Sequence, residues 1–260
     1  MVEKRRRCGK KPTERAALIF LKKTEKIMIA ILMAAGLGSR MAPLTEKTAK
    51  PLVRVKNKPM IETVIDSISG RVSHIYTVVG YRKEQFEYLR GKYKNLDLIE
   101  NTEFETVNNI SSIRAARNVM GSDDCFICEA DLYISDSSFF DNMPQNSCYF
   151  GKFVAGHSDD WVLDHDTNGR ITRIGKYGDD AYNMCGISYF TRSDASFIRD
   201  RIDEAYNRPG TYETLFWDDI VNANLDKLNL TIVPVEPGKI TELDSVSELA
   251  AFDPDYAQYN

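Results

Sequence analysis

Apolar runs alternate with segments of helical periodicity from about residue 27 onward. Short, nearly continuous apolar runs predict buried strands, and apolar residues recurring every three or four positions predict the helices between them. Asn108 or Asn109, and Ser193, are placed to cap helices. This order predicts an α/β fold with a mostly parallel sheet and helices on both faces. The predicted strands are 27–33, 75–79, 96–99, 125–130, 184–190 and 228–235, and the predicted helices are 59–68, 83–93, 109–120, 194–206 and 212–222.

Between about residues 146 and 190 the period of the pattern changes to two, which is typical of strands with one exposed face. Thr167, Asn168 and Gly169 predict a hairpin turn there. We expect a small β subregion inserted into one domain spanning 27–260, because the sequence contains no internal repeat and no long linker. The strands predicted for the insertion are 148–154, 161–166 and 171–175.

Charge is divided unevenly along the chain. Residues 1–26 form a basic N-terminal extension with a net charge of +7, whereas residues 27–260 carry −11. An acidic body argues against nucleic acid as the main partner. Within the extension, residues 13–26 predict a short amphipathic helix.

Composition narrows the class further. The chain has no run approaching the ~20 apolar residues that span a bilayer and no apolar stretch like a secretory signal, so we expect a cytoplasmic protein. Its five cysteines are an odd number and fit reduced thiols better than a disulfide framework. Cys125 and Cys128 have the spacing of a metal or redox pair, but their apolar neighbours favour a buried structural pair.

The most informative segment is the apolar run that ends in a glycine-rich turn, Ile31 to Thr45. Glycine at positions 36 and 38 lets such a turn adopt positive φ and present backbone N–H groups to phosphate oxygens. Arg40 and Lys50 add positive charge, which suits a nucleoside triphosphate. The segment is neither a Walker loop nor a dinucleotide fingerprint, because it lacks both spacings.

At full length, this segment is L-x-A-G-x-G-x-R-x-x-P-L-T, followed by a lysine and P-L-V. It resembles the signature of the sugar-nucleotidyltransferase-like superfamily, and from about Met28 to the C-terminus the chain is similar to bacterial CTP:phosphocholine cytidylyltransferases. Met28 is the start that this resemblance implies, and Ala49 departs from the usual proline before the signature lysine. Further matches are 79–81, 108–112, 129–131, Trp161, 216–218 and 242–244.

The resemblance implies a Rossmann-like nucleotidyltransferase fold and a Mg²⁺ ion held by Asp131 and Asp244. Arg40 and Lys50 also fit solvated loop charges, but the signature spacing favours a role in the site. Our hypothesis is that Arg40 grips the triphosphate while Lys50 stabilises charge on the α-phosphate, with no protein nucleophile. Taken singly, Asp131 also fits a polar strand end, and Asp244 fits the cap of the last short helix. The two carboxylates together with the glycine-rich turn favour the metal site.

The predicted substrate pockets involve two groups of residues. The nucleotide-binding group is Ala34, Ala35, Gly36, Gly38, Gly80, Tyr81, Asn108 and Ser112. The acceptor-binding group combines aromatic rings and a carboxylate, which suit a quaternary ammonium, although such rings also fit ordinary core packing. It consists of Trp161, Tyr182, Phe216, Trp217 and Asp218.

We therefore expect a Mg²⁺-dependent cytidylyltransferase that makes CDP-choline and pyrophosphate from CTP and phosphocholine. One alternative is a sugar-1-phosphate nucleotidyltransferase using UTP or dTTP, and another is a non-catalytic nucleotide-binding regulator. The sequence leaves open CTP against UTP, phosphocholine against phosphoethanolamine, and the oligomeric state.

Overall fold

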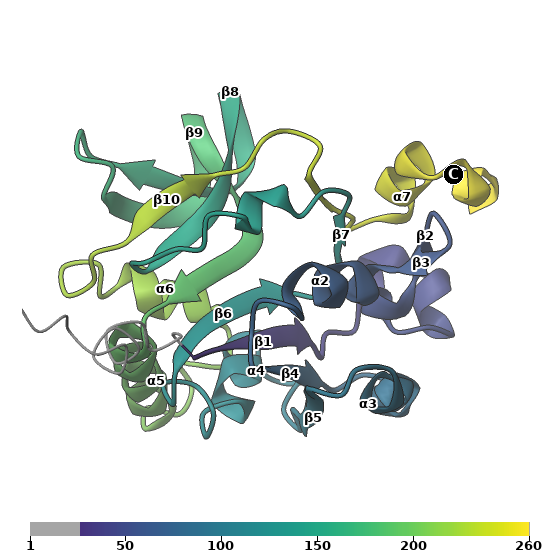
Figure 1. Cartoon of the computed structure of the whole chain (residues 1–260), viewed down its shortest axis with the longest axis horizontal. Coiled ribbons are helices and arrows are strands. Elements are labelled where there is room, and N and C mark those ends of the chain that lie inside the picture. The colour runs from purple at the N-terminus through teal and green to yellow at the C-terminus, as the bar shows by residue number, and fades with distance from the viewer. Residues whose placement is uncertain (1–26, 260) are drawn as a thin grey trace, which may run out of the picture.

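A seven-stranded sheet organises the molecule in this computed structural model, which describes residues 27–259 (Figure 1). The strand order is β10-β8-β9-β6-β1-β4-β5. β1 is parallel to both β4 and β6, β4 is parallel to β5 and β10 is parallel to β8. The α/β fold with a mostly parallel sheet is confirmed. The strands are β1 Met28–Ala34, β4 His74–Val79, β5 Leu96–Glu100, β6 Asp124–Glu129, β8 Cys148–His165, β9 Ile171–Phe190 and β10 Thr231–Pro234.

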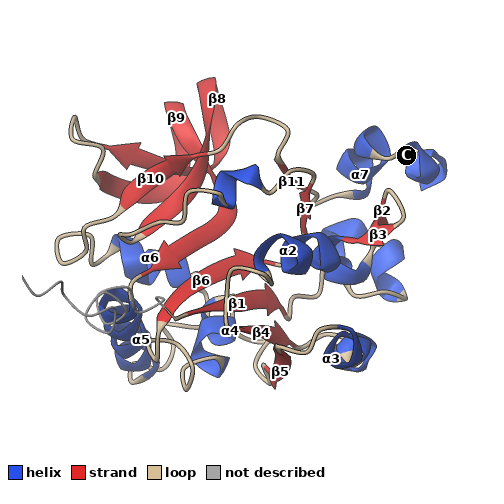
Figure 2. Ribbon diagram, in the orientation of Figure 1, coloured by secondary structure: helices blue, strands red, loops and turns tan. Residues whose placement is uncertain are grey.

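Helices cover both faces of this sheet (Figure 2). Alternate residues of β1 belong to two buried clusters, with Leu32 on the face of α2 and Ile31 on the face of α4, α5 and α6. This division is the consequence of side chains alternating along a strand. The helices are α2 Met60–Ile68, α3 Tyr88–Lys92, α4 Ile110–Ala115, α5 Arg192–Tyr206, α6 Trp217–Asn222 and α7 Val246–Phe252. Short 3₁₀ helices are Ser39–Met41, Leu44–Glu46, Lys50–Leu52, Lys83–Phe86, Ser138–Phe140 and Pro254–Tyr259.

The predicted β insertion is a long ribbon of β8 and β9 that rises from the sheet (Figure 1). The two strands pair antiparallel with several bulges, and the end of β9 returns to pair with β6, where Cys125 lies opposite Phe190. The segments predicted as separate strands, 148–154 and 161–166, belong to the single strand β8. Bulges bend β8 between these two segments. As a result, residues 182 and 183 of β9 pair with residues 152 and 153 of β8 and also with residues 162 and 163.

Several predicted helices are shorter than the sequence pattern suggested. The predicted cap Ser193 is wrong, and Asn109 stands at the predicted N-cap position without a capping hydrogen bond from its side chain. The pattern over 212–222 yields a helix only from Trp217, and Lys83–Tyr93 divides into a 3₁₀ helix and α3. Thr191, not Ser193, caps α5 by accepting from the backbone N–H of Asp194. The Asn109 side chain does not cap its own helix. Periodicity identifies the buried face of a helix, but tertiary hydrogen bonds decide where the helix ends.

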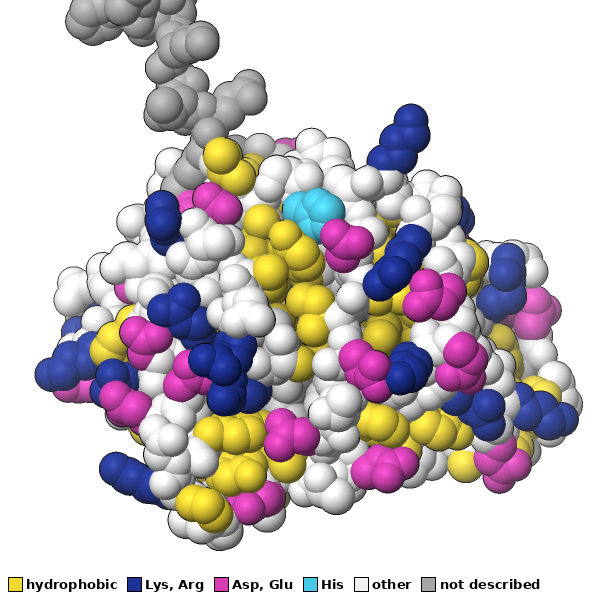
Figure 3. Space-filling view, turned by 90° about the horizontal axis from the view of Figure 1, so that it is seen from below, with side chains coloured by type: hydrophobic (Ala, Val, Ile, Leu, Met, Phe, Trp, Pro, Cys, Tyr) yellow, Lys and Arg dark blue, Asp and Glu magenta, His cyan; other side chains and the backbone are white. Residues whose placement is uncertain are grey.

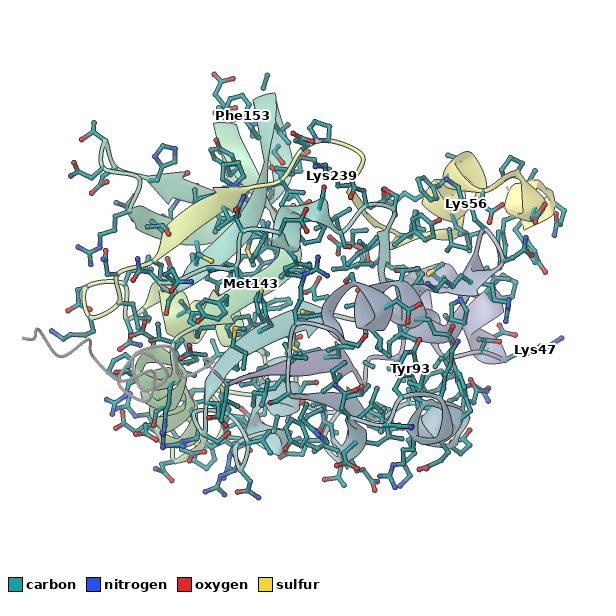
Figure 4. All side chains as sticks on the ribbon, in the orientation of Figure 1. Lys47, Lys56, Tyr93, Met143, Phe153 and Lys239 are labelled. Atoms are coloured by element: carbon teal, nitrogen blue, oxygen red, sulfur yellow. The ribbon has the colours of Figure 1, made fainter. Side chains whose placement is uncertain are left out.

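Two smaller sheets and the C-terminal segment lie beside the main sheet. β7 Leu132–Ile134 pairs antiparallel with β11 Ile240–Glu242, and β2 Arg54–Val55 pairs with β3 Lys58–Pro59. Lys56 lies beside α7, where its ammonium is 4.1 Å from the centroid of the Phe252 ring (Figure 4). These contacts attach the C-terminal segment to the main body.

The cysteines within the described residues are all buried and free, which confirms reduced structural thiols there. Burial raises the pKa of the Cys125 thiol to about 12. Among residues 27–259, no group of His, Cys, Asp and Glu side chains large enough to form a dedicated metal cluster is found. Cys8 and the helix predicted for 13–26 lie outside the described residues.

One face of the molecule carries charges of both signs. On the face seen from below, basic and acidic side chains are interspersed, with small apolar areas between them (Figure 3). No helix in residues 27–259 has both the length and the apolarity that crossing a bilayer requires.

Candidate active site

The glycine-rich turn follows β1 and packs directly against the signature lysine. Gly38 has a φ of +64°, and a Cβ on it would lie 2.7 Å from the Cβ of Lys50. Both observations require glycine at this position. Gly36 differs from the expectation, because it does not have positive φ and a Cβ there would meet nothing within 4 Å. Of the two glycines, only Gly38 is needed for the path of the turn.

A cluster of two cations and two carboxylates lies next to this turn. The Lys50 Nζ atom is 2.6 Å from Asp131 Oδ2 and 2.5 Å from Asp244 Oδ1. Arg40 approaches the other oxygen of Asp244, at 2.9 Å between Nη2 and Oδ2. Lys50 is buried, whereas the Arg40 side chain is 72% exposed. The structure thus brings Arg40 and Lys50 of the signature together with Asp131 and Asp244, which the family resemblance singled out.

Asp131 and Asp244 meet because short strands pair across the chain. Asp131 lies two residues after the end of β6, and the next residue, Leu132, lies opposite Glu242 in the β7–β11 ladder. Asp244 then stands just before α7, which Ser245 caps through a reciprocal capping box with Glu248. Asp244 is therefore not the helix cap, and its carboxylate is free to face Lys50.

The electrostatics of the cluster are dominated by close charges. Burial disfavours the ammonium of Lys50, but the carboxylates of Asp131 and Asp244 outweigh this and raise its pKa above the usual range. Burial and the carboxylate of Glu242 raise the pKa of Glu129 well above its usual range. Glu242 is exposed at one side, but desolvation by the protein around its carboxyl group raises its pKa too. The negative charge of Asp131 is the next largest cause. The raised pKa values of the two glutamates show that further negative charge is disfavoured beside Asp131 and Asp244, and a bound cation would relieve this repulsion.

A cleft of about 380 Å³, here termed the first cleft, opens over this cluster. Gly80 and Tyr81, predicted to bind nucleotide, lie outside its lining. The Tyr81 hydroxyl donates to the backbone carbonyl of Thr45, and a Cβ on Gly80 would clash with Phe104 and Ala35. Gly80 thus packs against Phe104 and Ala35, two residues that do line the cleft, and Tyr81 holds the end of the glycine-rich segment. Predicted residues that line the cleft are Ala34, Ala35, Gly36, Gly38, Arg40, Lys50, Asn108, Ser112, Asp131 and Asp244.

Three polar residues that line the first cleft had no role predicted from the sequence: Asn101, and the glutamates Glu129 and Glu242 of the matched segments 129–131 and 242–244. Asn101 is buried, and its Nδ2 donates to the hydroxyls of Ser111 and Ser112. It directly follows β5, so its place at the carboxyl edge of the sheet was an available signal. Both glutamates precede a predicted metal aspartate by two positions, and that repeated E-x-D spacing was a second signal.

The predicted aromatic residues do not converge on one cage. The rings of Trp161 and Phe216 meet edge to face at 5.2 Å between centroids. Trp217 is buried against Tyr149 and Phe190 in the core. None of these three aromatic residues lines the first cleft, so their part in binding an acceptor stays a prediction.

Tyr182 and Asp218, the other predicted acceptor residues, contact different neighbours. Tyr182 packs against Phe153 on the upper ribbon (Figure 4). Asp218 is buried and accepts a hydrogen bond of 2.8 Å from the Tyr149 hydroxyl. Burial raises the pKa of the Asp218 carboxyl to about 7. Neither residue lines the first cleft.

A second cleft of about 240 Å³ adjoins the first and shares Glu242 and Asp244 with it. It lies between the β8–β9 ribbon and the start of α7, and sequence reasoning assigned no function to the side chains on its ribbon side. Its lining consists of Lys152, Asp160, Asn183, Met184, Cys185, Gly238, Ile240, Thr241, Glu242, Asp244 and Glu248.

The family follows from a comparison with known domains. The model of the MobA-like NTP transferase domain matches residues 30–165, more than half of the chain. The chain belongs to this MobA-like family. It is 54% identical over 228 residues to the 2-aminoethylphosphonate cytidylyltransferase of Lancefieldella rimae, covering 87% of this chain and 92% of that protein.

Two comparisons with Streptococcus pneumoniae extend the likeness within the family. The choline-phosphate cytidylyltransferase of that organism is 32% identical over 222 residues, covering 85% of this chain and 95% of the relative. Among solved structures, the CTP:phosphocholine cytidylyltransferase from S. pneumoniae has a TM-score of 0.80 at 30% identity, covering 88% and 99% of the two chains. The predicted resemblance is confirmed, and the protein is a nucleotidyltransferase, which sets aside a non-catalytic regulator.

Proposed function

We propose that this nucleotidyltransferase transfers the cytidylyl group of CTP to a small phosphonate or phosphate that carries an amino group, with 2-aminoethylphosphonate as preferred acceptor. The observation that carries the proposal is the position of Lys50, buried between Asp131 and Asp244 beside the glycine-rich turn. The choice of nucleotide and acceptor is supported by the relative with 54% identity, which is named for that activity.

The cations of the first cleft suit transfer at the α-phosphate. Lys50 donates to oxygens that gain charge as an ionised acceptor oxygen attacks the α-phosphorus in line. Arg40, more exposed at the same cluster, holds the outer phosphates. The bond from the α-phosphorus to the bridging oxygen breaks, and pyrophosphate leaves with the electron pair. A phosphonate or phosphomonoester acceptor is already ionised at neutral pH, so no protein nucleophile or strong base is needed.

Asp131 and Asp244 fit a divalent metal such as Mg²⁺. Asp131 Oδ1 is a buried atom without a hydrogen-bond partner among the described residues, and such an atom calls for a ligand. One oxygen of each aspartate lies within 2.6 Å of the same nitrogen, so the two carboxylates already converge on one cation. Hard carboxylate oxygens suit Mg²⁺, which would reduce the negative charge of the triphosphate when bound.

Phosphocholine, the acceptor expected from the sequence, is the second candidate. The S. pneumoniae structure with a TM-score of 0.80 is named for it, and the Trp161–Phe216 pair offers aromatic faces near the ribbon. Quaternary ammonium groups bind to such faces. The preference between the two acceptors is therefore the finer part of the proposal.

A panel of donor and acceptor pairs tests the proposal. Pyrophosphate release is measured for CTP and UTP against 2-aminoethylphosphonate, phosphocholine, phosphoethanolamine and glucose 1-phosphate. We expect CTP with 2-aminoethylphosphonate to give the highest kcat/KM. A higher value with phosphocholine would move the acceptor to the second candidate, and a higher value with glucose 1-phosphate and UTP would support the sugar alternative.

A further inference from the structure

We infer that the second cleft binds the amino end of the acceptor through Asp160 and Asn183, and that it selects ammonium groups with N–H donors over quaternary ones. The inference rests on the proposed function and names the residues by which the enzyme would distinguish between acceptors. The second cleft meets the first at Glu242 and Asp244. An acceptor whose phosphonate lies beside Lys50 can therefore extend its amino end into the second cleft.

The ribbon positions the recognising side chains. Lys152 on β8 lies directly opposite Asn183 on β9, and paired residues of antiparallel strands project their side chains to the same face. The bend in β8 brings Val162 to the other side of Asn183, and with it nearby Asp160. Asn183 Nδ2 and Asp160 Oδ2 are 3.4 Å apart. The bulges of the ribbon thus bring an amide and a carboxylate to one wall.

One unsatisfied acceptor marks this wall. Asn183 Oδ1 is buried and has no hydrogen-bond partner within residues 27–259. The amide nitrogen is directed toward Asp160, which leaves the oxygen to accept from a ligand. Buried polar atoms are nearly always paired in native proteins, so this oxygen points to an absent donor.

The charge of the cleft also favours a cation. Among the described residues, its lining contains the acidic side chains of Asp160, Glu242, Asp244 and Glu248 and one basic side chain, Lys152. Asp244 is already paired with Lys50 and Arg40, so Asp160 is the carboxylate that the ribbon offers to a ligand. A primary ammonium brings one positive charge and three N–H donors, which matches a wall of oxygen acceptors. A trimethylammonium has no N–H donor and would leave these oxygens unpaired.

Aromatic faces, which a quaternary ammonium uses, are missing from the part of this lining that the structure describes. Trp161 follows Asp160 in sequence, but its ring packs edge to face on Phe216. The Phe216 ring already has a cation near it, because Lys176 Nζ lies 5.6 Å from its centroid. The aromatic pair is therefore engaged within the protein, and the second cleft offers hydrogen-bond acceptors.

The test compares two acceptors that differ only in N–H donors: 2-aminoethylphosphonate and its N,N,N-trimethyl analogue. Wild-type enzyme is expected to favour the primary amine by at least ~10-fold in kcat/KM, because the trimethyl group leaves site oxygens unpaired. Asn183→Leu and Asp160→Asn are each expected to reduce this ratio by ~10-fold through the KM of the amine. The KM of CTP should stay unchanged in both variants.

Asn168→Leu at the exposed hairpin turn is the matched control and should keep the wild-type ratio. Melting temperatures establish that each variant is folded. A wild-type ratio near one, or folded variants that keep the full ratio, would overturn the ammonium assignment while leaving the transferase function intact. Turnover of other acceptors with none of 2-aminoethylphosphonate would instead overturn the proposed acceptor and this inference together.

Discussion

Gly38 shows how one residue positions the candidate catalytic lysine. Its left-handed backbone and the 2.7 Å approach of a hypothetical Cβ to Lys50 leave no space for a side chain. Gly38→Ala is expected to lower the free energy of unfolding by roughly 1–3 kcal/mol, because it forces either backbone strain or movement of Lys50. Urea denaturation measures this loss, and pyrophosphate release should fall with it.

Gly36→Ala is the matched control in the same turn. A Cβ at Gly36 meets nothing within 4 Å, and the residue does not have positive φ. We expect its unfolding free energy to remain within about 0.5 kcal/mol of wild type. Equal losses at the two glycines would contradict the structural distinction between them.

Asp131 carries the proposed metal site together with Asp244. Asp131→Asn keeps the size of the side chain but removes the charge, so kcat/KM should fall by at least ~100-fold. Mn²⁺ affinity, measured by calorimetry on the folded variant, should fall as well. Asp141→Asn, an exposed residue paired with Arg71, serves as control. Unchanged Mn²⁺ affinity in the Asp131 variant would exclude this residue as a ligand.

The site residues that could be identified from the sequence with most detail are those that lie close together in the chain, within one signature. The turn, Arg40 and Lys50 belong to one continuous segment, residues 36–50, so the full signature and the family resemblance indicated their chemistry. Asp160 and Asn183 had no such signal, because their proximity depends on bulges in a ribbon, and a single bulge shifts which face a side chain occupies.

At the scale of elements, Asn109 links two helices. It stands at the N-cap position just before α4, but its Oδ1 accepts from the backbone N–H of Trp217, 3.0 Å away at the start of α6. Asn109→Ala should therefore lower the free energy of unfolding by about 1 kcal/mol, as loss of a helix cap does. Chemical denaturation with the exposed Asn142→Ala as control measures this, and equal stability of the two variants would contradict the link.

The juxtaposition of Asp131 and Asp244 depends on the pairing of two three-residue strands, β7 and β11, far apart in the chain. Such short strands have no distinctive periodicity, so the sequence predicted neither of them. The longer elements were predicted because a pattern that extends over several helical turns, or over a continuous apolar run, stays recognisable when single residues depart from it. The site was recognised from family-like motifs, and its geometry required the fold.

At the scale of the whole molecule, stability should depend on pH through Asp218. Its pKa is raised by burial from 3.8 to about 7, so the folded protein retains a proton that the unfolded chain loses as pH rises. Stability from this residue is therefore greatest below about pH 4 and falls toward about pH 7. Asp218→Asn keeps an acceptor for Tyr149 and removes this dependence.

We expect the unfolding free energy of Asp218→Asn, relative to that of wild type, to increase as the pH rises from about 4 to 7. The increase is up to roughly 1.4 kcal/mol for each pH unit. Above about pH 8 the difference should be constant. Urea titrations at several pH values give the unfolding free energy of each protein as a function of pH. The contributions of other titrating groups are the same in both proteins and cancel in the difference. Parallel curves throughout would mean that Asp218 ionises normally in the folded state.

The central claim is that Lys50, held between Asp131 and Asp244, stabilises transfer at the α-phosphate of CTP. Phosphorus NMR of the enzyme with Mg²⁺, CTP and 2-aminoethylphosphonate tests it most directly. The account predicts equal amounts of pyrophosphate and cytidylylated phosphonate with wild type, and formation at least ~100-fold slower with folded Lys50→Met. Product formation by Lys50→Met within a few-fold of the wild-type rate would contradict it.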